Sequence, residues 1–230
     1  AGQMYDQVRL GDLIQGLLDH LQPREELAAS PPARSQRFEP AGSQQLTSDR
    51  LFAALQGFLT ADMVVVSDTG DAFFQSARLK GLGRYLVQSF YLSIGFALPA
   101  GLGASLASPG QRVVILIGDG AFQMTAQELS TILRLRLPVT VILINNDGYV
   151  IERMLHHDAP YNEIQRWNYA ALPAVFGDCL SLRVVSEQDL ADALSQAGAA
   201  SGPVFLEIVL ERNDCAQSLR NIGKIEVAAG

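Results

Sequence analysis

Two polar segments carry the residues best suited to chemistry, and each follows a short apolar run. The segment GDGAFQ covers residues 118–123 after the run at 113–117, and NNDGYVIE covers residues 145–152 after the run at 139–144. Asp119 and Asn146 supply hard oxygen ligands, and the glycines let the backbone approach a ligand closely. Such oxygen donors suit Mg²⁺ held together with substrate phosphates. The two segments therefore predict a site for a metal ion and a phosphate-bearing ligand.

The elements that must position these segments alternate between strands and helices. The two apolar runs are short and rich in β-branched residues, which is typical of buried parallel strands. We expect further strands at residues 63–67, 86–88, 179–184 and 204–210, and helices at 47–59, 73–79, 98–106, 121–135 and 187–200. This alternation predicts an α/β fold with a doubly wound, mostly parallel sheet and helices on both faces. Both polar segments would then follow carboxyl ends of strands, where such sheets bind ligands.

The same segments carry a family resemblance. GDG, the 24-residue gap to NN and the run GYVIE at residues 148–152 together resemble the diphosphate-and-metal motif of thiamine-diphosphate enzymes. GYVIE and the stretch HHDAPYNEIQRWNY at residues 156–169 resemble the pyruvate and indolepyruvate decarboxylase branch. The resemblance covers residues 46 to 210 and implies the C-terminal, diphosphate-binding cofactor domain of a 2-oxo acid decarboxylase, with the thiamine-diphosphate-binding fold. Thiamine diphosphate and Mg²⁺ are the implied cofactors.

The resemblance assigns the metal ligands. Asp119 and Asn146 would bind Mg²⁺ by their side chains, and Gly148 by its carbonyl oxygen. Two diphosphate oxygens and a water would complete the coordination. The residues alone leave a plainer interpretation open, in which the aspartate caps the next helix and the asparagine lies in a turn.

Diphosphate contacts are implied at the start of the helix after GDG. A helix N-terminus offers free N–H groups to an anion. The backbone of Gly118, Gly120 and Ala121 would face the diphosphate there. Decarboxylases of the family often have serine at the position of Ala121, so one hydroxyl contact is missing. Thr69 and Asp71, in the segment DTGD, would add contacts from another strand end, although a helix cap would explain both residues as well.

A third segment is expected to shape the cofactor. In the family, a bulky apolar side chain before GDG wedges between the two cofactor rings, and Ile94 matches that position. The neighbouring residues are Leu92, whose carbonyl would hold the 4′-amino group, and Ser93. The wedge brings the 4′-imino nitrogen close to the thiazolium C2 proton, which is a proximity effect. Taken alone, Ile94 would be interpreted as a core residue.

Glu152 is the predicted catalytic residue. By resemblance it helps to expel CO₂ and then protonates or releases the product, and a carboxyl group near an apolar pocket can act as a proton donor. Ile151 and Leu155 resemble positions that line the substrate pocket and set its width, and Ile151 is also expected to contact the cofactor. The alternative for Glu152 is a solvated side chain on a short helix. His156 and His157 are expected on a lid or surface, because the paired catalytic histidines of the resembled decarboxylases come from another domain.

The chain is expected to contain three parts. Apolar residues at helical spacing between 10 and 21 predict an amphipathic helix, and we assign residues 1–27 to the C-terminal helix of a preceding middle domain. Residues 28–45 are rich in Ala, Ser, Pro and Gln and predict a linker. Residues 46–230 would form the cofactor domain with a C-terminal tail. A natural N-terminal extension is the alternative for the first part.

Composition narrows the class of protein. The 230 residues are 48% hydrophobic and 18% charged, which is ordinary for a globular α/β protein. A net charge of −7 argues against nucleic acid as the main partner. The two cysteines have no metal-ligand spacing, and the sequence shows neither a signal peptide nor an apolar stretch of about 20 residues. We therefore predict a cytoplasmic protein without a membrane partner.

The predicted function is non-oxidative decarboxylation of a 2-oxo acid to an aldehyde, catalysed by a carboxy-lyase that depends on thiamine diphosphate and Mg²⁺. This chain would supply the diphosphate and metal half of the site and be inactive alone. A pyrimidine-binding domain of the same or a partner chain would supply the rest, within a homodimer or homotetramer. Alternatives are a thiamine-diphosphate carboligase or lyase, and a non-catalytic cofactor-binding subunit of a split enzyme. A nicotinamide-dependent Rossmann enzyme is disfavoured, since no G-x-G-x-x-G follows the first strand.

Overall fold

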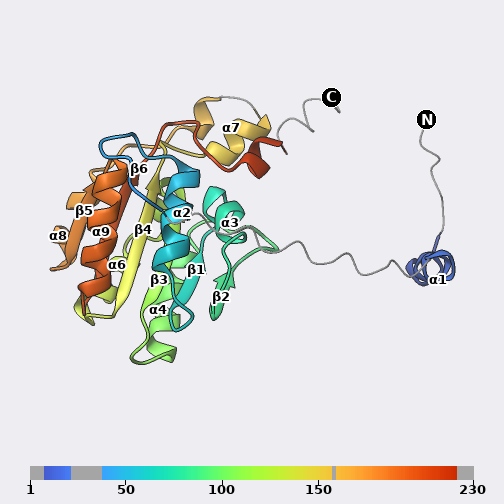
Figure 1. Cartoon of the computed structure of the whole chain (residues 1–230), viewed down its shortest axis with the longest axis horizontal. Coiled ribbons are helices and arrows are strands. Elements are labelled where there is room, and N and C mark those ends of the chain that lie inside the picture. The colour runs from blue at the N-terminus through green and yellow to red at the C-terminus, as the bar shows by residue number, and fades with distance from the viewer. Residues whose placement is uncertain (1–7, 22–37, 157–158, 222–230) are drawn as a thin grey trace. The chain divides into compact units, whose positions relative to one another are not determined.

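The computed structural model describes residues 8–21, 38–156 and 159–221 (Figure 1). The chain divides into two units, residues 1–35 and 36–230. The first unit contains helix α1 (Leu10–His20), none of whose residues is buried within it. The unit boundary falls inside the predicted linker, and residues 28–37 of that linker lie outside the described residues. The predicted amphipathic helix is thus present, and its assignment to a middle domain stays a prediction.

The second unit is built around a six-stranded parallel sheet with the strand order β2-β1-β3-β4-β6-β5. The strands are β1 (Val64–Ser67), β2 (Arg84–Val87), β3 (Val113–Gly118), β4 (Val139–Asn145), β5 (Leu180–Val184) and β6 (Val204–Val209). Every strand pair is parallel, and Val113 of β3 is in register with Val64 of β1 and Val139 of β4. The predicted doubly wound α/β sheet is confirmed.

Helices cover both faces of this sheet. They are α2 (Ser48–Phe58), α3 (Asp71–Ser76), α4 (Ala97–Ala107), α5 (Asp119–Thr125), α6 (Glu128–Arg134), α7 (Val150–His156), α8 (Pro173–Phe176) and α9 (Glu187–Ala199), with 3₁₀ turns η1 (Pro160–Asn162) and η2 (Tyr169–Ala171). Helix α2 packs with α9, which lies beside it in front of the sheet in Figure 1, and α4 packs with α6. Thr47 caps α2 by accepting the N–H of Arg50, and Ser186 and Asp189 form a capping box at α9.

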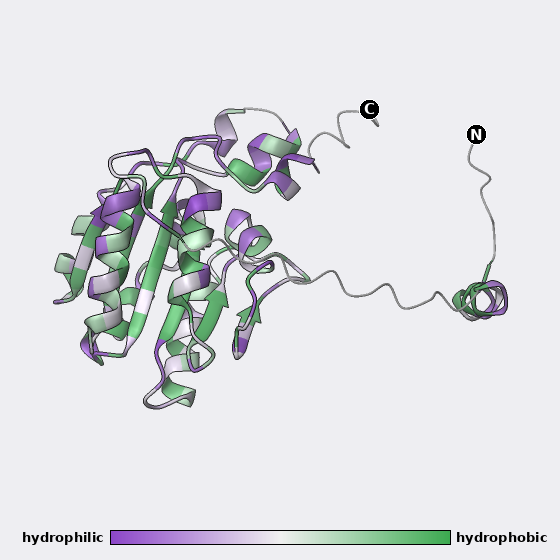
Figure 2. Ribbon diagram, viewed as in Figure 1, coloured by the Kyte–Doolittle hydropathy of each residue, from purple (hydrophilic) through white to green (hydrophobic). Residues whose placement is uncertain are grey.

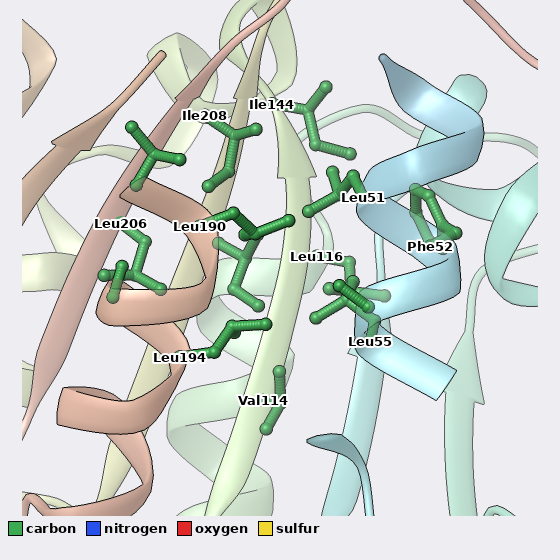
Figure 3. Close-up of a cluster of buried hydrophobic side chains, with 14 of the residues drawn as sticks. Leu51, Phe52, Leu55, Val114, Leu116, Ile144, Leu190, Leu194, Leu206 and Ile208 are labelled. Atoms are coloured by element: carbon green, nitrogen blue, oxygen red, sulfur yellow. The ribbon is translucent and has the colours of Figure 1, made fainter. Parts of the chain in front are cut away.

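Alternation along the central strands explains the two-sided core. Within β3, Val114 and Leu116 belong to the cluster under α2 and α9, whereas Val113, Ile115 and Ile117 belong to the cluster under α4 and α6. Figure 2 shows the strands as hydrophobic along most of their length. Figure 3 shows the first cluster, in which leucines of α2 and α9 meet strand side chains between the helices and the sheet. Both faces are buried, which is why the strand sequences are almost continuously apolar.

The helix predicted at residues 121–135 is wrong in its extent. The structure has α5 and α6, separated at residues 126–127. The N–H groups of Leu129 and Ser130 donate three residues back, to Ala126 and Gln127, so the regular four-residue ladder is interrupted. At the same place the Thr125 hydroxyl donates to the carbonyl of Gly95 at 2.9 Å. The break between the two helices thus coincides with a contact to a loop that is distant in the sequence. The spacing of apolar residues along the chain cannot predict such a contact.

The last residues of the predicted linker lie against the sheet unit. Gln45 forms a β-bridge with Ser186, and the N–H of Ala41 donates to a carboxylate oxygen of Glu187 at 2.7 Å. Glu187 also pairs with Arg50 of α2. The described residues from 38 onwards therefore belong to the second unit, which begins before the predicted domain start at 46.

The sheet order places a topological switch point beside the GDG segment. From β1 the chain passes to β2 on one side, and β3 lies on the other side of β1. The loops that leave the carboxyl ends of β1 and β3 therefore diverge and leave a crevice between them. Open parallel sheets bind ligands in this crevice.

Candidate functional site

A cavity of about 60 Å³ opens at this crevice. The sequence predicted thirteen site residues, and ten of them line this cavity. The three that do not line it are Leu92, Ser93 and Glu152. The ten are Thr69, Asp71, Ile94, Gly118, Asp119, Gly120, Ala121, Ile151, Asn146 and Gly148. They come from the ends of β1, β3 and β4, from the loop before α4 and from α7. Segments separated by up to 82 residues thus meet at one place.

Asp119 joins the two polar segments. Its side chain is 2% exposed, and its carboxylate accepts the N–H of Gly120 at 2.8 Å and that of Gly148 at 2.9 Å. Burial raises the pKa of Asp119 to about 6, against the opposing effect of these hydrogen bonds. A carboxylate with so costly a charge gains from a bound cation.

Asn146 supplies the second side-chain donor. It is 4% exposed and lines the cavity, and no hydrogen bond joins its side-chain amide to another described residue. The turn that carries it has two residues with positive φ, Asp147 at 61° and Gly148 at 118°. Aspartate tolerates this conformation better than most residues. At Gly148 a Cβ atom would lie 2.6 Å from the carbonyl oxygen of Asn162, so a glycine is needed.

Gly120 and Tyr149 lie close together in the lining of the cavity. A Cβ atom on Gly120 would lie 2.4 Å from the ring of Tyr149, so only glycine allows this close approach. The ring belongs to the segment after β4 and lines the same cavity. Sequence reasoning gave Tyr149 no role. Its position in GYVIE, next to a glycine expected to bind metal, was the available signal.

The donor set fits Mg²⁺ with a diphosphate better than it fits a metal held by protein alone. The described residues contain no group of three or more His, Cys, Asp or Glu side chains placed to hold a metal ion. Two aspartates line the cavity, but the carboxylate of Asp71 is already hydrogen-bonded within the protein, which leaves that of Asp119 with neutral oxygens of Asn146 and Gly148. Mg²⁺ is commonly bound by one or two carboxylates together with substrate phosphates and water. A set with a single available carboxylate therefore fits a site that shares the metal with a diphosphate.

Asp71 has its carboxylate engaged within the protein. One oxygen accepts the hydroxyl of Ser48 at 2.5 Å and the other accepts the N–H of Ala216 at 2.6 Å. Burial raises the pKa of Asp71. A contact between Asp71 and a diphosphate would therefore use its backbone or need these bonds to break. Thr69, by contrast, lines the cavity, and its hydroxyl takes part in no hydrogen bond to another described residue.

The wedge loop, residues 88–96, presents only one of its predicted residues to the cavity. Ile94 lines it while remaining 41% exposed, and Leu92 and Ser93 are exposed outside it. Leu92 has a φ of 53°, which is uncommon for a leucine. The side-chain oxygen of Gln88 accepts the N–H of Leu92 at 2.8 Å and so supports this turn.

Asp68 anchors the other end of the wedge loop and was missed by the sequence reasoning. The residue is fully buried, and its carboxylate accepts N–H groups from Thr69 at 3.0 Å, Gly95 at 3.2 Å and Ala97 at 2.8 Å. Burial raises its pKa, and the three hydrogen bonds oppose that rise. Asp68 therefore positions Ile94 through the backbone that directly follows it. A lone aspartate after a strand gave no signal of this partner.

Glu152 lies outside the cavity. Its side chain is 44% exposed and stands 3.8 Å from the Nε2 atom of His156 on the next turn of α7. Ile151, the preceding residue, does line the cavity and packs on a small cluster with Val150 and Leu219. His156 is exposed, as expected, and His157 lies outside the described residues. The structure thus places Glu152 beside the site and leaves its catalytic role a prediction.

A second cavity, of about 360 Å³, shares Asp119 with the first and extends along the ends of β4 and β6. Its charges are paired with one another. Arg166 binds Asp147, and Glu207 accepts hydrogen bonds from Asn145 at 2.8 Å and from the N–H of Ala170 at 3.1 Å. None of the other nominated residues lines it. The smaller cavity is accordingly the candidate site.

Comparison with known proteins gives a concordant result. The family model described as "Thiamine pyrophosphate enzyme, C-terminal TPP binding domain" matches residues 67–208. The chain is 38% identical over 221 residues to an alpha-keto-acid decarboxylase of Mycobacterium avium, covering 92% of the chain and 39% of the relative. It is 37% identical over 201 residues to pyruvate decarboxylase 2 of Pisum sativum, covering 82% of the chain and 48% of the relative.

The chain thus spans between about two fifths and half of the length of these curated relatives. The matched residues run from the end of β1 through β6 and include every segment that lines the candidate site. Because the model matches more than half of the chain, the chain belongs to the thiamine pyrophosphate enzyme family, through its C-terminal TPP-binding domain.

Proposed function

We propose that this chain supplies the diphosphate and metal half of the active site of a thiamine-diphosphate-dependent 2-oxo acid decarboxylase. The observation that carries the proposal is the convergence of ten nominated residues on one cavity at the switch point of the sheet. Relatives named as alpha-keto-acid and pyruvate decarboxylases support the same reaction class. The product would be an aldehyde.

The residues of the cavity would divide the work between metal and diphosphate. Asp119 and Asn146 would hold Mg²⁺ by their side chains, and Gly148 by its carbonyl oxygen. Gly120 would admit the diphosphate close to its backbone, and a glycine is also needed there because a Cβ atom would lie 2.4 Å from the ring of Tyr149. The acidic chain, with a net charge of −7, makes the metal the main source of attraction for the anion.

When bound, thiamine diphosphate supplies the electron sink for the bond that releases CO₂. The protein would contribute shape and proton transfer. Ile94, which lines the cavity, would set the angle between the cofactor rings, with Asp68 holding its loop. Glu152 would protonate or help to release the product from its place on α7.

The other half of the site would come from a pyrimidine-binding domain in the same or a partner chain, within a homodimer or homotetramer. The substrate would be a small 2-oxo acid. None of the described helices has the length and the apolar character that a membrane span would need. A cytoplasmic location stays a prediction from the sequence.

The test compares residues 1–230 alone with the protein that also contains the proposed pyrimidine-binding domain, which we call the full-length protein. We expect the chain alone to release no CO₂ from a panel of 2-oxo acids with thiamine diphosphate and Mg²⁺, and the full-length protein to form an aldehyde. Turnover by the chain alone in the usual enzyme range of about 1–10³ s⁻¹ would contradict the half-site proposal. A ligated product from the full-length protein would favour the carboligase alternative, and binding without turnover would favour a non-catalytic subunit.

A further inference from the structure

Arg153 is a buried cation with carbonyl groups around its guanidinium. It lies on α7, is 6% exposed, and follows the predicted catalytic Glu152 directly. Its Nη1 donates to the carbonyl of Asp147 at 3.1 Å, and its Nη2 donates to the carbonyls of Asn146 at 3.0 Å and of Arg212. Burying a charge is costly unless hydrogen bonds offset the cost. These hydrogen bonds to carbonyl groups offset part of the cost of burying the guanidinium charge.

Two of the three carbonyls belong to the metal loop, which we define as residues 145–148. They lie in consecutive peptide units between the proposed ligands Asn146 and Gly148. The loop has two successive residues with positive φ, and Nη1 lies 2.9 Å from the point that a Cβ on Gly148 would occupy. A rigid planar fork therefore spans the part of the loop whose shape sets the spacing of the donors.

The charge of Arg153 works against the metal. Its Coulombic interaction with Asp119 favours the charged carboxylate, but a fixed cation beside a Mg²⁺ site also repels the incoming ion. A purely electrostatic account therefore predicts that Mg²⁺ binds more tightly when this charge is removed. An account based on positioning predicts the opposite, because the loop loses its support.

We propose that Arg153 is a positioning residue that holds the metal loop in its Mg²⁺-binding shape and links that loop to the helix that carries Glu152. The inference rests on the proposed function for the identity of the metal. It adds a residue outside the cavity lining on which metal binding depends. It also gives α7 a direct mechanical connection to the metal loop, through the side chain that follows Glu152.

The experiment compares Arg153→Lys and Arg153→Met with the unchanged 230-residue chain. Mg²⁺ binding is measured by calorimetry in the presence of inorganic pyrophosphate, and the same variants are measured in the full-length protein with thiamine diphosphate. We expect both variants to bind Mg²⁺ about tenfold or more weakly, because lysine keeps the charge and loses the fork. Tighter binding by Arg153→Met with unchanged binding by Arg153→Lys would overturn the proposal. The matched control is Arg78→Met, an exposed arginine, which should bind as the unchanged chain does.

A second measurement separates this inference from the proposed function. Hydrogen exchange of the amides at residues 146–149 should become faster in Arg153→Lys, whose fold is checked by circular dichroism and thermal melting. If the unchanged chain and the full-length protein both fail to bind Mg²⁺ with diphosphate, the proposed function fails, and the exchange rates still decide whether Arg153 holds the loop. Exchange equal to that of the unchanged chain would overturn the inference even if Mg²⁺ binds.

Discussion

Two aspartates follow neighbouring strands at the same edge of the sheet, and they are used differently. Asp68 comes after β1 and Asp119 after β3, and each is at most 2% exposed. Burial raises the pKa of both, and backbone N–H groups oppose the rise in both. Only Asp119 lines the candidate cavity. Asp68 directs its carboxylate to the backbone of the wedge loop and the start of α4.

The difference arises from what the chain does after each strand. After β3 the helix α5 begins at Asp119 itself, so this carboxylate stays at the crevice and meets the metal loop through Gly148. After β1 the chain passes Gly70, at a φ of 76°, before α3 begins. The carboxylate of Asp68 then accepts N–H groups from Gly95 and Ala97, which arrive from elsewhere in the fold. The same residue type after neighbouring strand ends can therefore face a ligand cavity or hold a loop.

Replacing Asp119 should have the largest effect on this comparison. Asp119→Ala removes the single carboxylate of the proposed metal site, and we expect it to abolish Mg²⁺-dependent binding of thiamine diphosphate in the assembled enzyme. Calorimetry on the assembled enzyme measures this directly. Asp68→Asn should bind thiamine diphosphate more weakly but keep the dependence of that binding on Mg²⁺, and unchanged binding in Asp119→Ala would show that the metal assignment is wrong.

Glu152 extends the comparison to a carboxylate that is neither buried nor engaged with the backbone. Glu152→Gln removes the proposed proton donor, and turnover of the full-length enzyme should fall by about 10²–10⁴-fold while cofactor binding stays nearly intact. Steady-state kinetics and calorimetry on one preparation separate these effects. A turnover within about twofold of the unchanged enzyme would favour the solvated side chain instead.

Asp68→Asn should sharpen the loop-holding role. An amide keeps one acceptor oxygen but turns an NH₂ group towards at least one of the three donors, which should lower the free energy of unfolding by about 1–3 kcal/mol. Hydrogen exchange at the amide of Gly95 should accelerate, and thiamine diphosphate should bind more weakly while pyrophosphate does not. The matched control is Asp192→Asn, an exposed residue of α9. Equal exchange at Gly95 in both variants would refute the role.

The smallest expected effect is the pH dependence of the metal site. The pKa of Asp119 is raised from 3.8 to about 6 in the folded chain, so ionising it lowers stability as the pH rises through this interval. A bound cation needs the ionised form, and Mg²⁺ affinity should therefore fall by up to about tenfold per pH unit below about 6. Calorimetry at a series of pH values tests this. Asp68→Asn should keep the same profile, and a profile flat across this range would contradict the assignment.

Much of the site was predictable because it is local to three strand ends. The segments GDG and NNDGYVIE each follow an apolar run, and parallel strands bring their carboxyl ends to one edge. The match of residues 67–208 to the thiamine pyrophosphate enzyme family confirms the recognition that these segments allowed. The roles of the individual residues remain predictions.

The sequence by itself determined the fold class, the order of its elements and the segments that form the cavity. The spacing of apolar residues and the positions of turn residues are local properties of the sequence, so they can be recognised without the tertiary structure. Only the tertiary structure decided which donors each carboxylate meets. In the folded chain the carboxylate of Asp68 accepts hydrogen bonds from the wedge loop and the start of α4, and that of Asp71 accepts them from Ser48 and Ala216. The guanidinium of Arg153 donates to the metal loop. The tertiary structure also separated α5 from α6 where Thr125 reaches Gly95. These contacts join residues from separate segments, most of them far apart along the chain, and a buried charge takes whichever hydrogen-bonding partners the packed fold places around it.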